Sequence, residues 1–400
     1  MKIAILTSGI LPVPAIQGGA VENLVDLYLE YNEHHKLHDI TVYSVKPTNY
    51  ADKYLLPVNS GAANHYYYIE AQTIWAKFKK KAYQITHGEG YYHYTIEYYL
   101  SQALRHISKQ HYDFIILENR PGYALKLKDY TEARFVYHLH NDLLNSQTKL
   151  GKQIYQLADR IITVSDFIGS RVKTINPTDT KCVTAYNGID IEPIKSRLGT
   201  NEDVFRNRKA LGFEPDDFIV SFSGRLIPEK GILPLIQAMR QIQEHKNIKL
   251  MVLGGYALGN SKEQTPFQKE IQLATEGLNN IVFTGYVPYN EIGNFLNIAD
   301  IAALPSIWEE PFGLTCVEAM AAGLPLITTR SGGIPEIANE QCAIFVERGE
   351  RLVTQLASAI LDLYQHPEKK KAMSLAVQNK ADYFNKERYA RDFFNALSTI

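Results

Sequence analysis

Two glutamates, Glu310 and Glu318, bracket a segment whose sequence predicts the start of a helix. The apolar stripe that follows and the stop signal at Gly323 predict that residues 312–315 form the first helical turn. Backbone N–H groups of a first turn have no partners within the helix and lie at its positive end, so they favour a phosphate. Carboxylates instead accept hydrogen bonds from sugar hydroxyls. A ligand with a phosphate between two polyols, a nucleotide sugar, fits both features.

The whole stretch reads Glu-Pro-Phe-Gly-Leu-Thr-Cys-Val-Glu-Ala-Met-Ala-Ala-Gly and resembles the donor-site signature of glycosyltransferase family 4, the retaining enzymes with the GT-B fold. The resemblance implies that Glu310 holds hydroxyls of the donor sugar and that Glu318 holds the ribose. It also implies that the diphosphate is bound by backbone N–H groups of Phe312, Gly313, Leu314 and Thr315. A bare Glu-x7-Glu spacing is common by chance, but the residues around it make this match specific.

The implied reaction moves a hexose from a nucleotide diphosphate sugar to a hydroxyl of a glycan or lipid-linked glycan, with retention of the α-configuration. By analogy the setting is bacterial surface or exopolysaccharide synthesis, and by family frequency the nucleotide is UDP. No carboxylate pair resembles the nucleophile and acid of a retaining glycosidase, so the resemblance implies a front-face displacement. We expect no cofactor and no divalent metal, because no Asp-x-Asp cation motif stands at the site.

Two cations are expected at the same edge of the donor domain. Residues 223–226 close one predicted strand with Gly224 and Arg225, and Lys230 opens the helix that follows. Arginine offers a forked contact to a phosphate and lysine a point charge. The family resemblance implies that Arg225 and Lys230 neutralise the leaving diphosphate. The alternative is a pair of solvated charges in a loop.

A glycine pair in the first half offers a further contact with the donor. Gly18 and Gly19 follow the first predicted strand and open a helix, where backbone can approach an anion closely. The family has a Gly-Gly here, near the diphosphate and the acceptor. The alternative is an ordinary turn.

Two histidines, His138 and His140, end a predicted strand and share one of its faces, because side chains alternate along a strand. The family places a histidine at this strand end against the hydroxymethyl group of the donor sugar. His140 is our choice, with His138 as the alternative. A metal site would need a third ligand, and the spacing suggests none. The remaining alternative is that either histidine is a core residue that only satisfies its own hydrogen bonds.

Other strand ends match the family less specifically. Tyr286 and Val287 are expected to border the pocket for the base. Ser165 and Asp166 match a family pattern at a strand end that lines the cleft, or else they cap a helix. These positions are weaker candidates than the glutamates and cations of the donor domain.

Size and composition set the broad class. A chain of 400 residues exceeds one comfortable core, which predicts two domains. Its formal net charge of −1 gives no reason to expect a nucleic-acid partner. The three cysteines are few and far apart, which fits a reducing compartment, and no apolar run is long enough to span a membrane. A cytoplasmic protein, placed peripherally at the inner face of the membrane if the acceptor is lipid-linked, is therefore expected.

The alternation of short apolar runs with helical patterns predicts an α/β protein. The resemblance implies the GT-B form, with two doubly wound Rossmann-like domains facing a central cleft. Domains are expected at residues 1–195, for the acceptor, and 201–385, for the donor. The last helix, 386–400, is expected to pack back on the first domain. Strands are predicted at 3–6, 40–45, 66–69, 114–117, 135–139, 161–164 and 183–186, and again at 218–222, 249–253, 281–283, 301–304, 326–328 and 344–346.

A basic and aromatic cluster at residues 75–83 is either a surface for anionic lipid or a solvated helix face. Two rival functions remain at this stage. One is an epimerase of GT-B-like fold that acts on the nucleotide sugar without an acceptor. The other is a non-catalytic partner subunit, which would have no need to keep both glutamates and both cations.

Overall fold

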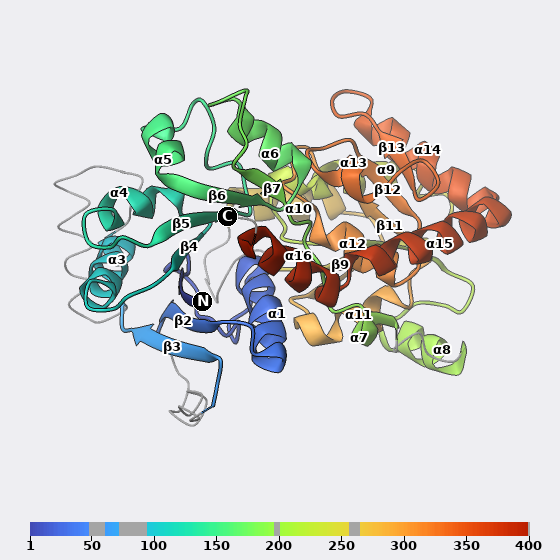
Figure 1. Cartoon of the computed structure of the whole chain (residues 1–400). Coiled ribbons are helices and arrows are strands. Elements are labelled where there is room, and N and C mark those ends of the chain that lie inside the picture. Colours follow the sequence, from blue (N-terminus) through green and yellow to red (C-terminus); the bar gives the residue numbers. More distant parts are fainter. Residues whose placement is uncertain (48–60, 72–93, 196–200, 256–264, 399–400) are drawn as a thin grey trace. The chain divides into compact units, whose positions relative to one another are not determined.

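The structure is a computed structural model that describes residues 1–47, 61–71, 94–195, 201–255 and 265–398 (Figure 1). The chain forms two compact units. Unit 1 comprises Met1–Gly188 and Lys386–Ile400, and unit 2 comprises Ile189–Asn385. These bounds differ by a few residues from the predicted domains, 1–195 and 201–385. The basic and aromatic cluster at 75–83 lies outside the described residues.

Unit 1 is built on a parallel sheet of seven strands in the order β3-β2-β1-β4-β5-β6-β7. Each strand overlaps one predicted in the first half of the sequence, with ends that differ by at most three residues. The apolar side chains of the five inner strands are almost entirely buried, as expected for a sheet covered on both faces, whereas those of the edge strands β3 and β7 are mostly half-buried. The strands are β1 (Lys2–Leu6), β2 (Asp39–Val45), β3 (Asn64–Ile69), β4 (Phe114–Glu118), β5 (Arg134–Leu139), β6 (Ala158–Thr163) and β7 (Cys182–Thr184).

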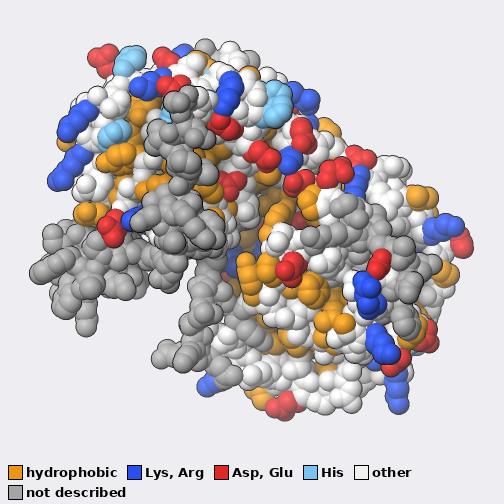
Figure 2. Space-filling view, turned by 90° about the horizontal axis from the view of Figure 1, so that it is seen from below, with side chains coloured by type: hydrophobic (Ala, Val, Ile, Leu, Met, Phe, Trp, Pro, Cys, Tyr) orange, Lys and Arg blue, Asp and Glu red, His pale blue; other side chains and the backbone are white. Residues whose placement is uncertain are grey.

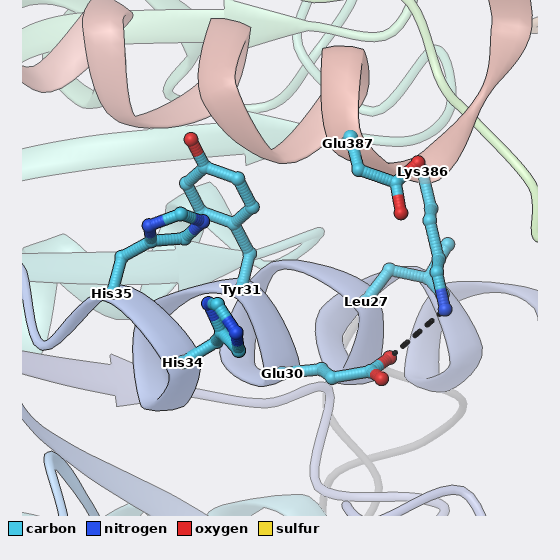
Figure 3. Close-up of a pocket in the computed structure, with 7 residues that line it drawn as sticks. All are labelled: Leu27, Glu30, Tyr31, His34, His35, Lys386 and Glu387. Carbon is cyan, nitrogen blue, oxygen red and sulfur yellow. Dashed lines mark ion pairs between the residues drawn. The ribbon is translucent and has the colours of Figure 1, made fainter.

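Helices connect these strands and cover the sheet. They are α1 (Ala20–His35), α3 (Tyr94–Ile107), α4 (Ala124–Leu127), α5 (Gly151–Leu157), α6 (Asp166–Lys173) and, from the far end of the chain, α16 (Lys386–Ser398). Helix α16 lies beside α1, where Phe393 stacks on Tyr28 with 4.1 Å between ring centroids (Figure 1). Figure 3 shows the solvent side of this contact, where Lys386 pairs with Glu30 at 3.5 Å. Buried aromatic packing therefore holds α16 in unit 1, with an exposed ion pair at its edge.

Unit 2 has a parallel sheet of six strands in the order β10-β9-β8-β11-β12-β13. The strands are β8 (Phe218–Ser223), β9 (Ile248–Leu253), β10 (Ile281–Gly285), β11 (Ile301–Leu304), β12 (Leu326–Thr329) and β13 (Ala343–Val346). The helices are α7 (Glu192–Lys195), α8 (Asn201–Ala210), α9 (Ile232–Gln241), α10 (Pro266–Thr275), α11 (Ile292–Leu296), α12 (Leu314–Ala321), α13 (Ile334–Ile337), α14 (Leu352–Gln365) and α15 (Pro367–Ala381). The prediction of two doubly wound units is confirmed.

Parallel strands place all their carboxyl ends at one edge of a sheet, and every predicted site residue follows such an end or lies on the helix beyond it. In unit 2, Arg225 follows β8, Tyr286 follows β10 and Glu310 follows β11. In unit 1, Gly18 follows β1 and His140 follows β5. The fold therefore collects the candidates of each unit at a single edge.

Charges of both signs are interspersed on the face seen in Figure 2, in keeping with a formal net charge of −1. None of the helices within the described ranges combines the length and apolar character that crossing a bilayer requires.

Candidate functional site

The centre of the candidate site in unit 2 is the carboxylate of Glu310, which lies in the loop between β11 and α12. Its Oε1 atom accepts hydrogen bonds from the Ser306 hydroxyl at 2.7 Å and the Trp308 indole N–H at 3.0 Å. The ammonium group of Lys230 pairs with the same oxygen. Three donors on one oxygen fix the carboxylate and leave its other oxygen, Oε2, without a partner among the described residues. That oxygen is available to accept hydrogen bonds from hydroxyl groups of a ligand.

The charge state of Glu310 follows from these partners. Burial alone would raise its pKa, but the Lys230 ammonium and the hydrogen bonds outweigh burial and hold the pKa below its usual value of 4.5. The Lys230 ammonium also lies 5.9 Å from the centre of the Trp308 ring. The pair of Glu310 and Lys230 is thus ionised and preorganised at neutral pH. Sequence reasoning selected both residues but missed Ser306 and Trp308, although they stand within four residues of Glu310.

The helix start beside Glu310 differs by two residues from the prediction. Helix α12 begins at Leu314, because Gly313 has a φ of +108° and acts as the residue before the first turn. The prediction that Phe312 and Gly313 belong to the first helical turn was therefore wrong. The Phe312 side chain is buried and its ring lies 5.8 Å from that of Phe384. Its part in the site is to anchor the loop.

The open end of α12 offers the expected backbone donors. Within the described part of the chain, the N–H groups of Gly313, Leu314 and Thr315 have no hydrogen-bond partner, and these residues are only half-buried. The first N–H of the helix with a backbone partner is that of Cys316, which donates to Gly313 at 2.9 Å. Successive free N–H groups at a helix start favour an anion. Binding of a phosphate here stays a prediction.

Glu318 lies one turn further along α12 and is almost wholly buried, with 5% of its surface exposed. No described residue donates a hydrogen bond to its carboxylate or forms an ion pair with it. Burial without a partner raises the pKa of Glu318 to about 8, although the Lys230 ammonium pulls it down. A buried carboxyl that lacks a partner is a place where a ligand hydroxyl can bind.

Two glycines let neighbouring loops approach the site. A Cβ atom on Gly332 would lie 2.0 Å from the backbone oxygen of Glu310, and one on Gly231 would lie 2.0 Å from that of Pro305. Both glycines have positive φ, +52° and +72° respectively. They hold the loops of Glu310 and Lys230 together by backbone contact that no other residue type allows.

Replacement of Gly231 with alanine is expected to lower the free energy of unfolding by about 3 kcal/mol or more, because the backbone of Pro305 must move. Gly212 is a matched control, since its φ is +79° but no atom lies within 4 Å of an added Cβ. Gly212→Ala should cost only about 1 kcal/mol, for the left-handed conformation. Urea denaturation measures both. Equal losses would show that the contact with Pro305 is unimportant.

The remaining unit 2 candidates are open to solvent. Arg225 is exposed, and no described residue forms a hydrogen bond or ion pair with its guanidinium group. Gly224 before it has a φ of +147°, and its backbone oxygen would lie 1.9 Å from a Cβ on Gly254. Tyr286 is 74% exposed and Val287 is half-buried. Arg225 is thus a free cation at the edge that carries Lys230, and Tyr286 offers an exposed ring.

In unit 1 the N-terminal end of α1 is already occupied by a carboxylate of the chain itself. Oε2 of Glu22 lies 2.2 Å from the position of a Cβ on Gly19, and the φ of +111° at this position itself favours glycine. Glu22 also accepts a hydrogen bond from the Ser8 hydroxyl at 3.2 Å. An external anion at Gly18 and Gly19 would meet this carboxylate. The role of the two glycines at the donor stays a prediction, and Glu22 was not foreseen.

His140 and His138 do share a face of β5, and a third residue joins them. Glu118, at the end of the neighbouring strand β4, lies 2.8 Å from Nε2 of His140 and 3.0 Å from Nδ1 of His138. Together the three side chains form a group that could hold a metal ion. The third ligand that sequence spacing failed to suggest is therefore present, contributed by an adjacent strand. The signal in the sequence was an acid at the end of an otherwise apolar strand.

Ser165 and Asp166 both make hydrogen bonds within local structure, as the capping alternative predicts, and their place in a ligand site stays a prediction. The Ser165 hydroxyl accepts a hydrogen bond from the N–H of Ile168 at 3.2 Å and so caps α6. Asp166 accepts hydrogen bonds from the hydroxyls of Thr184 and Tyr186 at 2.5 and 2.9 Å. Both side chains are thereby committed to the ends of α6 and β7.

Two protein-family models match the sequence. The model for glycosyl transferases group 1 matches residues 203–380, and the model for glycosyltransferase family 4 matches residues 33–193. Together they cover most of the chain, one in each half.

Relatives and solved structures agree with these matches. The spore coat protein SA of Bacillus subtilis is 28% identical over 96% of this chain and 95% of that protein. The lipopolysaccharide 1,2-N-acetylglucosaminetransferase of Salmonella typhimurium is 28% identical over 61% of this chain and 62% of that enzyme. Anabaena HepE, solved in complex with UDP and glucose, superposes with a TM-score of 0.73 over the full length of both chains at 22% identity. At that identity the likeness shows the fold alone.

Proposed function

The chain belongs to the family 4 glycosyltransferases of GT-B fold, and on this premise we propose that it transfers a hexose from a UDP-sugar to a hydroxyl of a glycan or lipid-linked glycan, with retention of the α-configuration. The observation that carries the proposal is the ionised pair of Glu310 and Lys230 beside the open N-terminal end of α12. Glu310 offers oxygen to sugar hydroxyls, and the helix end offers N–H groups to a diphosphate. Few ligands other than a nucleotide sugar would use both.

The proposed roles follow from charge and position. Lys230 and the unpaired Arg225 stabilise the negative charge that develops on the leaving diphosphate, together with the N–H groups of Leu314 and Thr315. Glu310 orients the donor sugar, and Glu318 accepts a ribose hydroxyl. The ring of Tyr286 and the side chain of Val287 border the base. The acceptor hydroxyl is itself the nucleophile: its oxygen bonds to the sugar carbon as the bond from that carbon to the diphosphate breaks. The leaving phosphate takes the hydroxyl proton, so no side chain of the protein is needed as general base. In this scheme the two cations take the part that a divalent metal plays in other transferases.

The donor and acceptor classes find support in the comparisons. HepE was solved with UDP and glucose, which favours UDP as the nucleotide. The Salmonella relative acts on lipopolysaccharide, which favours a glycan acceptor in polysaccharide synthesis. A cytoplasmic enzyme that meets its acceptor at the inner face of the membrane is the setting proposed.

A transfer assay tests the proposal. The protein is incubated with UDP-glucose, UDP-galactose or UDP-N-acetylglucosamine and a bacterial lipid-linked glycan fraction, with EDTA present in one arm. We expect release of UDP that depends on the acceptor, an α-linked product by NMR, and no loss of rate with EDTA. A β-linked product would contradict retention. Conversion of the donor to its epimer without acceptor would favour the epimerase instead.

A further inference from the structure

Glu118 is a carboxylate with no exposure to solvent, at the carboxyl end of β4. A buried charge is tolerated only when hydrogen bonds replace its hydration. Three donors surround it: the Tyr28 hydroxyl at 2.8 Å, Nδ1 of His138 at 3.0 Å and Nε2 of His140 at 2.8 Å. Burial opposes ionisation, but His138 and His140 outweigh it and lower the pKa of Glu118 to about 2. The group is therefore an ionised carboxylate that accepts hydrogen bonds from three side chains.

Packing from two helices fixes this cluster of Glu118, His138, His140 and Tyr28. The Tyr28 ring, on α1, stacks on Phe393 of α16, and the same phenylalanine lies 5.0 Å from the His138 ring. Charged neighbours are few. Among the described residues, Glu22 is the one further carboxyl whose pKa Glu118 raises, and burial is the main cause of that rise. This packing holds Tyr28 and His138 against Glu118.

This arrangement determines which nitrogen of His140 carries a proton. An ionised carboxylate has no proton to give, so Nε2 of His140 must be the donor. Burial, reinforced by His138, lowers the pKa of His140 to about 4, so the ring carries a single proton at neutral pH. Its Nδ1 atom is then a hydrogen-bond acceptor. In the described part of the chain Nδ1 is buried and has no partner.

We propose that Glu118 is a positioning residue that holds His140 in the Nε2–H tautomer, so that Nδ1 accepts a hydrogen bond from a hydroxyl of the substrate. Of the three side chains in contact at Glu118, only His140 keeps measurable exposure, 8%. It lies at the carboxyl edge of the unit 1 sheet, the edge at which parallel sheets generally bind ligands. The unpaired Nδ1 atom would gain a hydrogen bond when a sugar hydroxyl binds at this edge. The inference rests on the proposed function for its substrate class, a sugar donor or acceptor.

The same three residues could ligate a metal ion, and the hydrogen bonds favour positioning instead. A metal would displace the protons that now join both histidines to Glu118. The two readings predict different protonation of His140, so one experiment separates them.

The test is the tautomer of His140, observed by long-range 1H–15N NMR on protein labelled with 15N-histidine and assigned with the variant His140→Asn. In the parent protein we expect the Nε2–H form between pH 6 and 8, unchanged by EDTA. In Glu118→Gln the amide nitrogen can donate to a ring nitrogen, so we expect the Nδ1–H form or a mixture. Turnover should fall about tenfold, the size of one lost hydrogen bond, with a smaller change in KM. Glu30→Gln makes the same substitution at an exposed site of unit 1 and should change neither.

Either of two results would overturn the inference. One is an Nδ1–H or metal-bound ring in the parent protein, which can be read even if Glu118→Gln fails to fold. The other is a folded Glu118→Gln variant with the parent tautomer and parent turnover. Because the spectrum needs no donor, it stays decisive even if the transfer assay finds no activity.

Discussion

Replacement of Lys230 with alanine is expected to lower turnover at least about 100-fold, the size of losing one donor to the transition state. The ammonium group has two tasks in the proposed mechanism. It stabilises charge on the leaving diphosphate, and it holds Oε1 of Glu310 in place together with Ser306 and Trp308. Without it the carboxylate stays buried with weaker compensation, so donor binding should weaken as well. Initial rates with the donor found in the transfer assay measure both effects.

Arg225→Ala provides a comparison, because Arg225 has no partner among the described residues and does not touch Glu310. We expect a similar loss of turnover with less effect on donor affinity. Lys246→Ala removes an exposed lysine elsewhere in unit 2 and should behave like the parent protein. Turnover of Lys230→Ala within a few-fold of the parent would reject the assigned role.

The second large effect concerns stability and pH. Glu318 has a folded-state pKa of about 8 against a usual value of 4.5. Between these values the folded chain holds a proton that the unfolded chain releases, so stability falls as pH rises from about 4.5 to about 8. At about 1.4 kcal/mol per pKa unit the loss amounts to about 4 to 5 kcal/mol at pH 8. Glu318→Gln cannot ionise and should remove this loss, which makes the variant more stable than the parent at pH 8 and no different below pH 4.5.

Urea denaturation at several pH values measures this difference. In a Trp75→Phe background Trp308 is the single tryptophan, so its fluorescence reports on unit 2. Glu350→Gln changes an exposed glutamate of the same unit and serves as the control. A gain for Glu318→Gln that does not depend on pH, or no gain at all, would show that Glu318 is ionised in the folded protein. A carboxyl that binds a ligand but lowers the stability of the folded protein is common at active sites.

Much of the fold was predictable because its signals are local. Buried strands such as 114–117 and 301–304 are short apolar runs, and the structure confirms every predicted strand to within a few residues. The proximity of Glu310 and Lys230, which form an ion pair, could also be anticipated, because parallel strands bring the carboxyl ends of β8 and β11 to one edge of the sheet. The exact helix start could not. Gly313 takes a positive φ that pattern alone does not reveal, so α12 begins two residues later than predicted.

The parts that sequence reasoning missed depend on contacts between distant segments. Glu118 meets His140 because β4 lies beside β5. Tyr28 joins the cluster because its hydroxyl, on α1, donates to Glu118. Neither residue stands at a recognisable spacing from the histidine. Glu22 likewise appeared as an ordinary acid in the first turn of a helix, whereas the structure folds it back over Gly19. Side-chain partners of a site are thus harder to predict than the motif that carries its chemistry.

The most direct test of the account is a binding screen of UDP, GDP and ADP, each free and as its common sugars, by thermal shift. The account predicts a selective shift with one nucleotide sugar that is reduced in Glu310→Ala and retained in Lys246→Ala. Such a result would fix the donor and place it at the edge of unit 2 that carries Glu310. The absence of a shift with every nucleotide would contradict the account and favour a non-catalytic partner subunit that has kept the fold.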